Sequence, residues 1–202
     1  MTYYAVLGAF LDCDKKNKIF SLLLAGFLIS VFSCASTNAS GGSPLYAKLT
    51  GNSKYRLLPT ENIETPMDAQ QFVTASYGGS SFQVSSWVKA DKNGIDVTLV
   101  NELGANMGEL SYRDGAVSFS SRVFPKYVEG EFIVADFQLC FYDALALRAA
   151  LEDCGLSLID NETGRRVFQG EKLIIEIEKR QNAVRFVNHL RGYAYTIEGD
   201  FE

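Results

Sequence analysis

The sequence predicts a mainly β, α+β fold: a large antiparallel sheet with a helical element packed on or inside it. Apolar and polar residues alternate between residues 69 and 121, and tight-turn pairs interrupt the alternation. A stretch rich in leucine and alanine replaces this pattern over residues 134–153. Alternating apolar segments return after Gly155 and continue almost to the C-terminus. The order is therefore strands, helix, strands.

The first set should contain five strands, over residues 72–77, 82–89, 95–100, 107–112 and 116–121. Asn93-Gly94 is a strong hairpin signal because both residues tolerate a positive φ. Asp114-Gly115 predicts a second hairpin turn of the same kind. Residues 101–106 form the loop between the third and fourth strands.

The segment 134–153 has high helical propensity, and Gly155 is a natural terminator. It is apolar on more than one face, so it should be largely buried. Asp143 could break it by capping a second helix. The second set of strands then falls at 156–159, 167–168, 173–177, 184–187 and 193–197, with turns at 161–164 and 181–182.

The N-terminal segment reads as a bacterial lipoprotein signal. Lys15, Lys16 and Lys18 precede an apolar run that ends in Val31-Phe32-Ser33-Cys34. A single transmembrane helix is the alternative, but the run from 19 to 33 is shorter than the roughly 20 residues a span needs. The end of the run resembles the lipobox, which implies cleavage before Cys34 and a lipid on that cysteine.

Three segments follow from this interpretation: a signal peptide (1–33), a lipidated tether (34–45) and a folded domain (46–202). The tether is rich in serine and glycine, as linkers are. In lipoproteins of this kind an aspartate after the cysteine retains the protein in the inner membrane. Ala35 stands there instead, so the resemblance implies the outer membrane, with the domain facing the periplasm.

Charge excludes one class of partner. The chain has 19 basic and 24 acidic residues. The predicted signal peptide contains three of the basic and two of the acidic residues, so the mature chain keeps 16 basic and 22 acidic residues and has a net charge near −6. An acidic surface repels phosphates, so we expect no nucleic acid, and membrane association must come from the anchor. The mature length fits one domain, and we expect a monomer.

Catalytic and metal-binding patterns are missing from the sequence. His189 is the single histidine, and no Gly-x-Ser-x-Gly motif supplies a nucleophile. No ligand pair has short metal-site spacing. We therefore expect no enzyme, metal or cofactor; a hydrolase would need a nucleophile clustered with His189. Cys140 and Cys154 are either buried free thiols or, if the helix breaks near Asp143, a disulfide.

Residues 77–115 resemble the same stretch of the LolB-type outer-membrane lipoprotein receptors. The shared order is a strand with a tryptophan (Trp87), a hairpin, a strand of alternating residues (95–99), a loop, and a strand ending Glu109-Leu110. The loop reads Asn-Pro-Leu-Gly in those receptors, and 101–104 reads Asn-Glu-Leu-Gly. From Tyr46 onward the chain is also similar to lipoproteins encoded in aryl polyene biosynthesis clusters, through segments 55–59, 135–139 and 147–151.

This resemblance implies a LolA/LolB-like half-open β-barrel with helices plugging its concave side. Proteins of that family hold acyl chains in such a cavity, and a loop leucine inserts into the membrane. The corresponding residue in this chain is Leu103. An equally weighted alternative is that Leu103 is an ordinary hydrophobic turn residue that packs under the sheet. Trp87 is opposite in phase to Phe82, so one face of the sheet would be a ligand wall and the other solid core. The candidate cavity residues are aromatic or aliphatic strand positions: Phe82, Trp87, Leu99, Tyr112, Phe119, Ile175, Phe186, Tyr193 and Tyr195.

The function expected is that of an outer-membrane lipoprotein that binds a lipid, acylated or aryl-polyene-type cargo and assists its insertion into the outer membrane. The partners would be the membrane, an apolar lipid-like ligand, and a periplasmic LolA-like carrier or exporter. The alternative is a non-catalytic scaffold that holds an export or biosynthesis partner at the membrane.

Overall fold

The computed structural model describes residues 44–122, 124, 126 and 128–199. The predicted signal peptide, Cys34 and all but the last two residues of the predicted tether lie outside these residues. Gly42–Glu202 forms one compact unit. The fold below is that of this unit.

Ten strands form one antiparallel sheet, which confirms the mainly β prediction. The first set comprises β3 (Met67–Tyr77), β4 (Ser80–Asp91), β5 (Gly94–Val100), β6 (Asn106–Arg113) and β7 (Ala116–Ser121). The second set comprises β8 (Ser157–Asn161), β9 (Gly164–Gln169), β10 (Lys172–Arg180), β11 (Ala183–Asn188) and β12 (Tyr193–Gly199). These are the strands that the alternation predicts, mostly lengthened at their ends, and both predicted hairpins form. Asp114 (φ 50°) and Gly115 (φ 71°) make the β6–β7 turn as predicted. In the β4–β5 hairpin, Asp91 pairs with Gly94, so the turn residues are Lys92 and Asn93, and neither Asn93 nor Gly94 has the positive φ that the prediction assumed.

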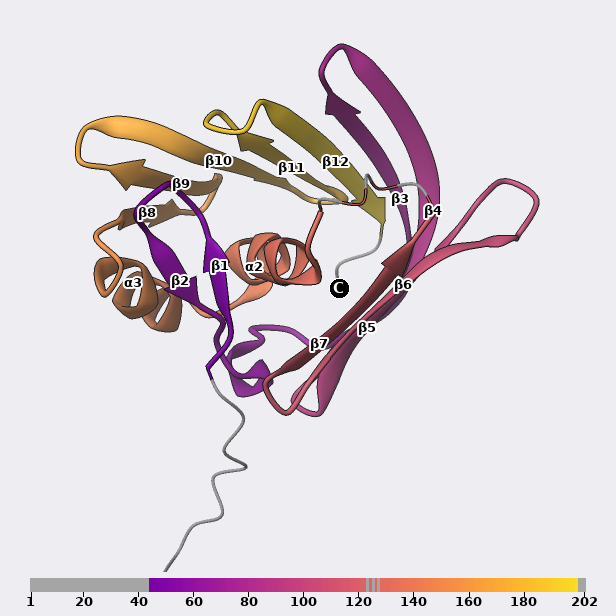
Figure 1. Cartoon of the computed structure of the whole chain (residues 1–202), viewed down its shortest axis with the longest axis horizontal. Coiled ribbons are helices and arrows are strands. Elements are labelled where there is room, and N and C mark those ends of the chain that lie inside the picture. Colours follow the sequence, from indigo (N-terminus) through magenta and orange to yellow (C-terminus); the bar gives the residue numbers. More distant parts are fainter. Residues whose placement is uncertain (1–43, 123, 125, 127, 200–202) are drawn as a thin grey trace, which may run out of the picture. The chain divides into compact units, whose positions relative to one another are not determined.

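The first strand of the first set and the last strand of the second set join the two sets. β3 pairs with β12, from Tyr193 opposite Tyr77 to Gly199 opposite Gln71. The order is therefore β7-β6-β5-β4-β3-β12-β11-β10-β9-β8, and the edge strands are β7 and β8. Because the chain leaves the sheet at β7 and re-enters it at β8, the helices between them must span from one edge to the other. The sheet bends around them and is not closed into a barrel (Figure 1).

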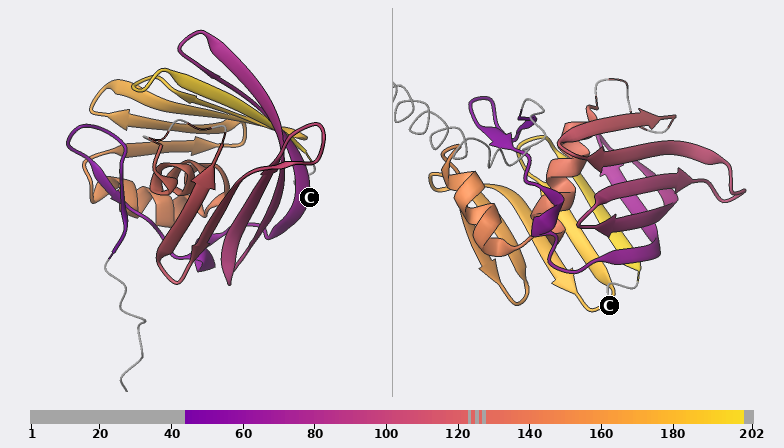
Figure 2. Two further views of the ribbon diagram at one scale, coloured as in Figure 1. Left: turned by 45° about the vertical axis from the view of Figure 1, so that its right-hand side comes forward. Right: turned by 90° about the horizontal axis from the view of Figure 1, so that it is seen from below.

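Two helices replace the single predicted stretch: α2 (Gly130–Phe141) and α3 (Ala144–Glu152). The predicted break at Asp143 is confirmed, because its Oδ1 accepts hydrogen bonds from the backbone N–H groups of Leu145 (3.0 Å) and Ala146 (2.9 Å). Gly155, with φ +78°, follows the second helix as predicted. The views in Figure 2 place α2 on the concave side of the sheet.

A short N-terminal segment closes one end of the structure, and the alternation of the sequence does not predict it. It consists of β1 (Tyr46–Lys48), β2 (Lys54–Arg56) and the 3-10 turn η1 (Thr60–Asn62). Thr60 donates a 2.7 Å hydrogen bond through Oγ1 to the carbonyl oxygen of Lys92, in the β4–β5 turn. Ile63 forms a bridge with Tyr142, just after α2. The segment thus connects one end of the sheet to the end of the helix.

The two halves of the concave face differ in how they are filled. Over β8–β11, α3 and the β1–β2 hairpin complete a solid core. Five of its members are at most 2% exposed: Leu147, Leu151, Ile174, Ile175 and Ile177. Over β3–β7 the main cover of the concave face is α2 (Figure 1), with Phe124 beside it and Leu58 next to Tyr112 of β6. The second half is therefore where space remains.

Candidate ligand cavity

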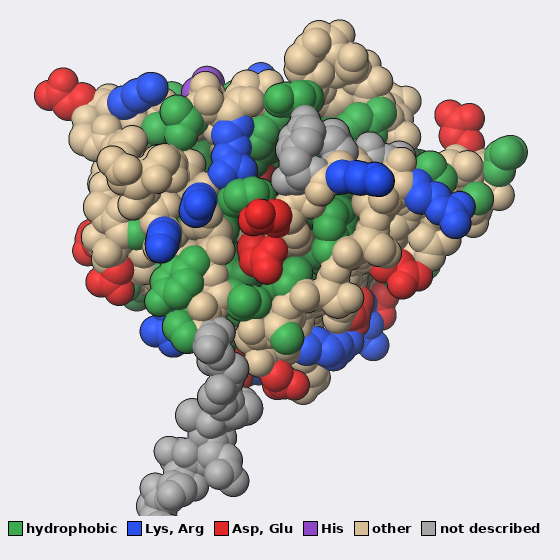
Figure 3. Space-filling view, in the orientation of Figure 1, with side chains coloured by type: hydrophobic (Ala, Val, Ile, Leu, Met, Phe, Trp, Pro, Cys, Tyr) green, Lys and Arg blue, Asp and Glu red, His purple; other side chains and the backbone are tan. Residues whose placement is uncertain are grey.

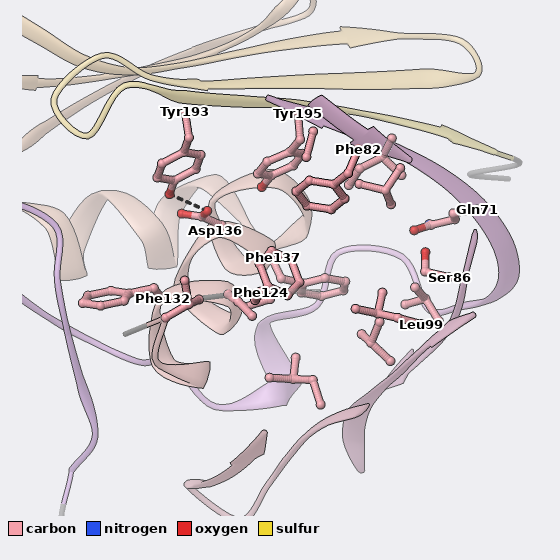
Figure 4. A pocket seen from close by; sticks show the side chains of 18 of the residues that line it. Gln71, Phe82, Ser86, Leu99, Phe124, Phe132, Asp136, Phe137, Tyr193 and Tyr195 are labelled. Carbon is pink, nitrogen blue, oxygen red and sulfur yellow. Dashed lines mark hydrogen bonds between the residues drawn. The ribbon is translucent and has the colours of Figure 1, made fainter. Parts of the chain in front are cut away.

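A cavity of about 450 Å³ lies between α2 and the concave face of β3–β7 and β12. Side chains from six strands and α2 converge on it, and most of them are apolar or aromatic (Figure 4). The strands contribute every second residue, because side chains alternate between the two faces of a sheet. On β4 these are Phe82, Ser86 and Val88, and on β3 they include Val73 and Ala75.

The wall of the cavity is apolar but not fully buried. Phe82, Phe119, Phe137, Tyr193 and Tyr195 are only partly buried although they point into the concave side of the sheet. Aromatic side chains inside a domain normally pack at crystal-like density. Their partial exposure here shows that the protein's own side chains do not fill the space. Hydrophobic side chains are also visible on the face drawn in Figure 3, among scattered charges of both signs.

Five of the nine candidate residues line this cavity: Phe82, Leu99, Phe119, Tyr193 and Tyr195. Trp87 does not, which corrects the expectation for that residue. It lies on the opposite face of β4, is 53% exposed, and donates from Nε1 to Oδ1 of Asp68 at 3.2 Å. The face of Phe82 is the cavity wall, as the phase difference between Trp87 and Phe82 allowed. The face of Trp87 is exposed, so the expectation that the other face is solid core is wrong.

Tyr112, Ile175 and Phe186 are also not cavity residues, because they belong to the solid core. Tyr112 is 3% exposed, and its hydroxyl donates to the carbonyl oxygen of Leu58 at 3.0 Å. Ile175 is 1% exposed and lies in β10, on the filled half. Phe186 is fully buried and stacks on Tyr195 with ring centroids 4.8 Å apart, so it supports a wall residue from outside the cavity.

The residues of α2 that line the cavity were not predicted from the sequence. Phe132, Ile133, Phe137 and Phe141 of α2 and Phe124 of the preceding segment line the space. The signal was present as the i, i+4 spacing of Ile133, Phe137 and Phe141. It was hidden because α2 is also apolar on its other faces, where Val134, Ala135 and Leu139 are fully buried in the core.

The cavity wall contains one buried acid. Asp136 of α2 is 9% exposed and accepts a 2.6 Å hydrogen bond from the Tyr193 hydroxyl. Asn188 donates to the same hydroxyl oxygen from Nδ2 at 3.3 Å. Burial raises the pKa of Asp136 to about 7, against the smaller lowering effects of the Tyr193 hydrogen bond and the charge of Arg191. The cavity therefore carries a carboxyl group that is close to half protonated at neutral pH.

Leu103 is 92% exposed, at the tip of the loop between β5 and β6. The turn alternative, in which it is tucked under the sheet, is therefore wrong. The Asn101 side chain holds the loop, since Oδ1 accepts from the backbone N–H groups of Leu103 (3.0 Å) and Ala105 (2.9 Å). Gly104 has φ +75°, which an L side chain rarely adopts. The leucine is presented by an ordered loop.

The antiparallel register places the Leu103 loop at a definite end of the cavity. The β3–β4 turn, the β5–β6 loop and the β11–β12 turn lie at the same end of their strands. Cavity residues Tyr77, Tyr193 and Arg191 come from this end. The opposite end is the one that η1 and the β4–β5 turn close. Leu103 thus lies at the open end of the sheet.

The remaining candidates lie elsewhere. Cys140 is buried, Cys154 is half-buried, and both are free thiols. His189 is near the surface, with Nε2 3.7 Å from Oε2 of Glu176. Within the described ranges, no group of three or more histidine, cysteine or acidic residues could hold a metal ion. No helix in this part of the chain has the length and apolar character needed to cross a membrane.

The residues that form the ten-stranded sheet, α2 and α3 match a known protein family. A family described as a protein of unknown function (DUF3261) matches residues 68–199. The chain belongs to the DUF3261 family. The matched range of this DUF3261 chain runs from the start of β3 to the end of β12 and so includes the whole cavity wall. It leaves out β1, β2 and η1, which close the end of the sheet. No curated protein matches the chain.

Proposed function

We propose that this protein is an outer-membrane lipoprotein that binds the apolar chain of a lipid, acylated or polyene-type cargo in its cavity and assists its insertion into the outer membrane. The cavity carries the proposal: an apolar space of about 450 Å³, walled by partly exposed aromatic side chains, suits a hydrocarbon chain. Each methylene removed from water contributes about 0.8 kcal/mol, so even a partly enclosed chain binds usefully.

The curvature of the sheet supports the finer comparison with a half-open barrel. In the proposal the sheet is the open half of a LolA/LolB-like barrel and α2 is its plug. The edge strands β7 and β8 remain unpaired with each other, which leaves room for a ligand to enter beside the helix. A scaffolding protein, the alternative function, would be favoured by a concave face filled with side chains, as it is over β8–β11 but not over β3–β7.

The proposed mechanism is passive. A periplasmic carrier or exporter delivers the apolar chain to the open end of the cavity, and the chain then moves from the cavity into the membrane leaflet. A lipid on Cys34 keeps the domain at the membrane. Leu103, at the open end and almost fully exposed, is the residue placed to enter the leaflet.

The test is to purify the full chain from its own envelope in mild detergent, extract it with organic solvent and identify bound molecules by mass spectrometry. The variant Ala75→Trp should empty the protein of ligand, because Ala75 lies between Phe82 and Tyr195 on the cavity wall. Thr74→Trp is the matched control, since its side chain is on the exposed convex face.

A stoichiometric apolar ligand in the wild type and in Thr74→Trp, absent from a folded Ala75→Trp, supports the proposal. A wild-type protein that carries no ligand and takes up no fluorescent fatty-acid probe overturns it. That outcome would favour the scaffolding alternative.

A further inference from the structure

Two polar side chains face each other on the sheet wall of the apolar cavity. Gln71 of β3 and Ser86 of β4 are direct cross-strand partners, and both line the cavity. Figure 4 shows both side chains pointing into the space from the same wall. Ser86 is 2% exposed and Gln71 is 3% exposed, so neither is in contact with bulk water.

Their hydrogen-bonding capacity is almost unused. Ser86 Oγ is buried and has no hydrogen-bond partner among the described residues. The Gln71 side chain makes one hydrogen bond to the described residues, a weak one in which Nε2 donates to Sδ of Met67 at 3.8 Å. A buried polar group without a partner is costly, and such groups are rare in folded proteins. A hydroxyl and an amide left open side by side offer donors and acceptors to a ligand.

The pair lies in the inner part of the cavity. Tyr77, at the open end, is six residues further along β3 than Gln71, which is roughly 20 Å of extended strand. A ligand that enters beside the β3–β4 turn therefore reaches Gln71 and Ser86 with its leading part. Phe82, Val73 and Ala75 line the wall between the two positions.

The charges around the cavity select an uncharged group. The acidic residues that line the space are Glu109 and Asp136, and Arg191 is the basic one. The Arg191 guanidinium lies 3.9 Å above the ring of Phe132 and donates to the carbonyl oxygen of Lys48. Arg191 belongs to the β11–β12 turn at the open end, far along the strands from Ser86. A carboxylate or phosphate placed at Ser86 would therefore be buried without a cation, at a large cost.

We propose that Ser86 and Gln71 form a subsite for an uncharged hydroxyl or ester group carried near the leading end of an otherwise apolar ligand. This inference rests on the proposed function and adds that the cargo is not a plain hydrocarbon chain with a methyl end. The ligand group accepts from the Gln71 amide or the Ser86 hydroxyl and, if it is a hydroxyl, donates to the free oxygen of either residue.

The experiment compares two photoreactive probes of equal length on the full chain in mild detergent. One is a long-chain fatty alcohol with a mid-chain diazirine, and the other is the same chain with a methyl group in place of the hydroxyl. Labelled residues are mapped by peptide mass spectrometry. The wild type should be labelled at the cavity wall, about fivefold more strongly by the alcohol, which is the effect of one hydrogen bond.

Ser86→Ala should abolish the preference for the alcohol and leave labelling by the hydrocarbon probe unchanged. The variant removes a buried unpaired hydroxyl, so its melting temperature should stay the same or rise. Ser85→Ala, the same change on the neighbouring residue and the opposite face of β4, should keep the preference. Gln71→Leu provides a second variant, with an apolar side chain of similar size.

Equal labelling by the two probes in the wild type overturns the subsite and leaves the proposed function standing. A preference that survives both Ser86→Ala and Gln71→Leu does the same, because it shows that another group recognises the hydroxyl of the probe. Absence of cavity labelling by either probe overturns the proposed function, and the subsite with it.

Discussion

The Tyr193 hydroxyl donates a 2.6 Å hydrogen bond to Oδ2 of Asp136, and this bond joins β12 to α2 at the wall of the cavity. The two residues are 57 positions apart in the sequence. Asn188 supports the pair by donating to the same tyrosine oxygen. The plug helix is thus fixed to the sheet by a polar contact beside an apolar space.

The stability of the protein should fall as the pH rises through the titration of Asp136. Its pKa is about 7 in the folded state and near 3.9 in an unfolded chain, so the folded state binds the extra proton between these values. Stability therefore decreases as pH increases across this window. The free energy of unfolding should be about 2–3 kcal/mol lower at about pH 8 than at about pH 5 from this residue alone.

Asp136→Asn is the matched variant, because its Oδ1 can still accept from Tyr193 while the side chain no longer titrates. Denaturant unfolding of both proteins at the two pH values isolates Asp136, since the other titrating groups contribute equally to each. The variant should lack this part of the pH dependence. The same pH dependence in both proteins would show that Asp136 titrates normally.

Gln138 of α2 should be the strongest single polar contributor to the position of the helix. The Gln138 side chain is fully buried. Its Oε1 accepts hydrogen bonds from the Tyr55 hydroxyl and from the Leu58 N–H, both at 3.0 Å. Its Nε2 donates to the Leu58 carbonyl oxygen at 2.8 Å. Gln138→Leu leaves the hydroxyl and the amide unpaired, so we expect a loss of about 2–4 kcal/mol in the free energy of unfolding.

A double-mutant cycle with Tyr55→Phe checks the cause of this loss. Tyr55→Phe removes the hydroxyl that Gln138→Leu leaves without a partner, so the two changes together should cost clearly less than their sum. Additive losses would mean that the buried hydroxyl finds another partner.

The close approach of α2 to β7 depends on Gly130. A Cβ atom there would lie 2.6 Å from Cγ1 of Val117 and 2.7 Å from Cβ of Phe119. Gly130→Ala should therefore displace the helix start and destabilise the protein by about 1–2 kcal/mol, although alanine is the better helix former. Thermal unfolding measures the loss. Val117→Ala removes one of the two clashing groups and should restore part of the stability; no restoration would place the strain elsewhere.

The strands could be read from the sequence because their signals are local. Alternation marks the strands, and Asp114-Gly115 specifies a hairpin turn through its two positive φ angles. Asn93-Gly94 marks the place of a hairpin but not its turn, which consists of Lys92 and Asn93. Asp143 marked the helix break for the same reason, since a cap acts on backbone groups two and three residues away. β1 and β2 escaped because each is three residues long with one buried residue, too short for a period to show.

The cavity could be predicted only in part, because it depends on long-range pairing. The pairing of β3 with β12 decides that Tyr193 and Tyr195 meet Phe82 across one wall, and no local pattern encodes it. Without this pairing, the sequence does not show which face of β4 is concave, so both Trp87 and Phe82 were candidates for the cavity wall. Ser86 went unnoticed since a serine in a strand is ordinary until its burial and lack of a partner are known.

Leu103 should matter for delivery of the ligand and not for its binding or for folding. Its side chain is 92% exposed, so Leu103→Asp should change the free energy of unfolding by less than about 0.5 kcal/mol. A leucine that enters a membrane contributes about 1.5–3 kcal/mol, so transfer of bound lipid to vesicles should slow about tenfold or more. Leu145→Asp is the control, because Leu145 is also an exposed leucine (72%) but lies on α3. Normal ligand content with slow transfer in Leu103→Asp alone places the residue in the exit step, whereas unchanged transfer removes it from the mechanism.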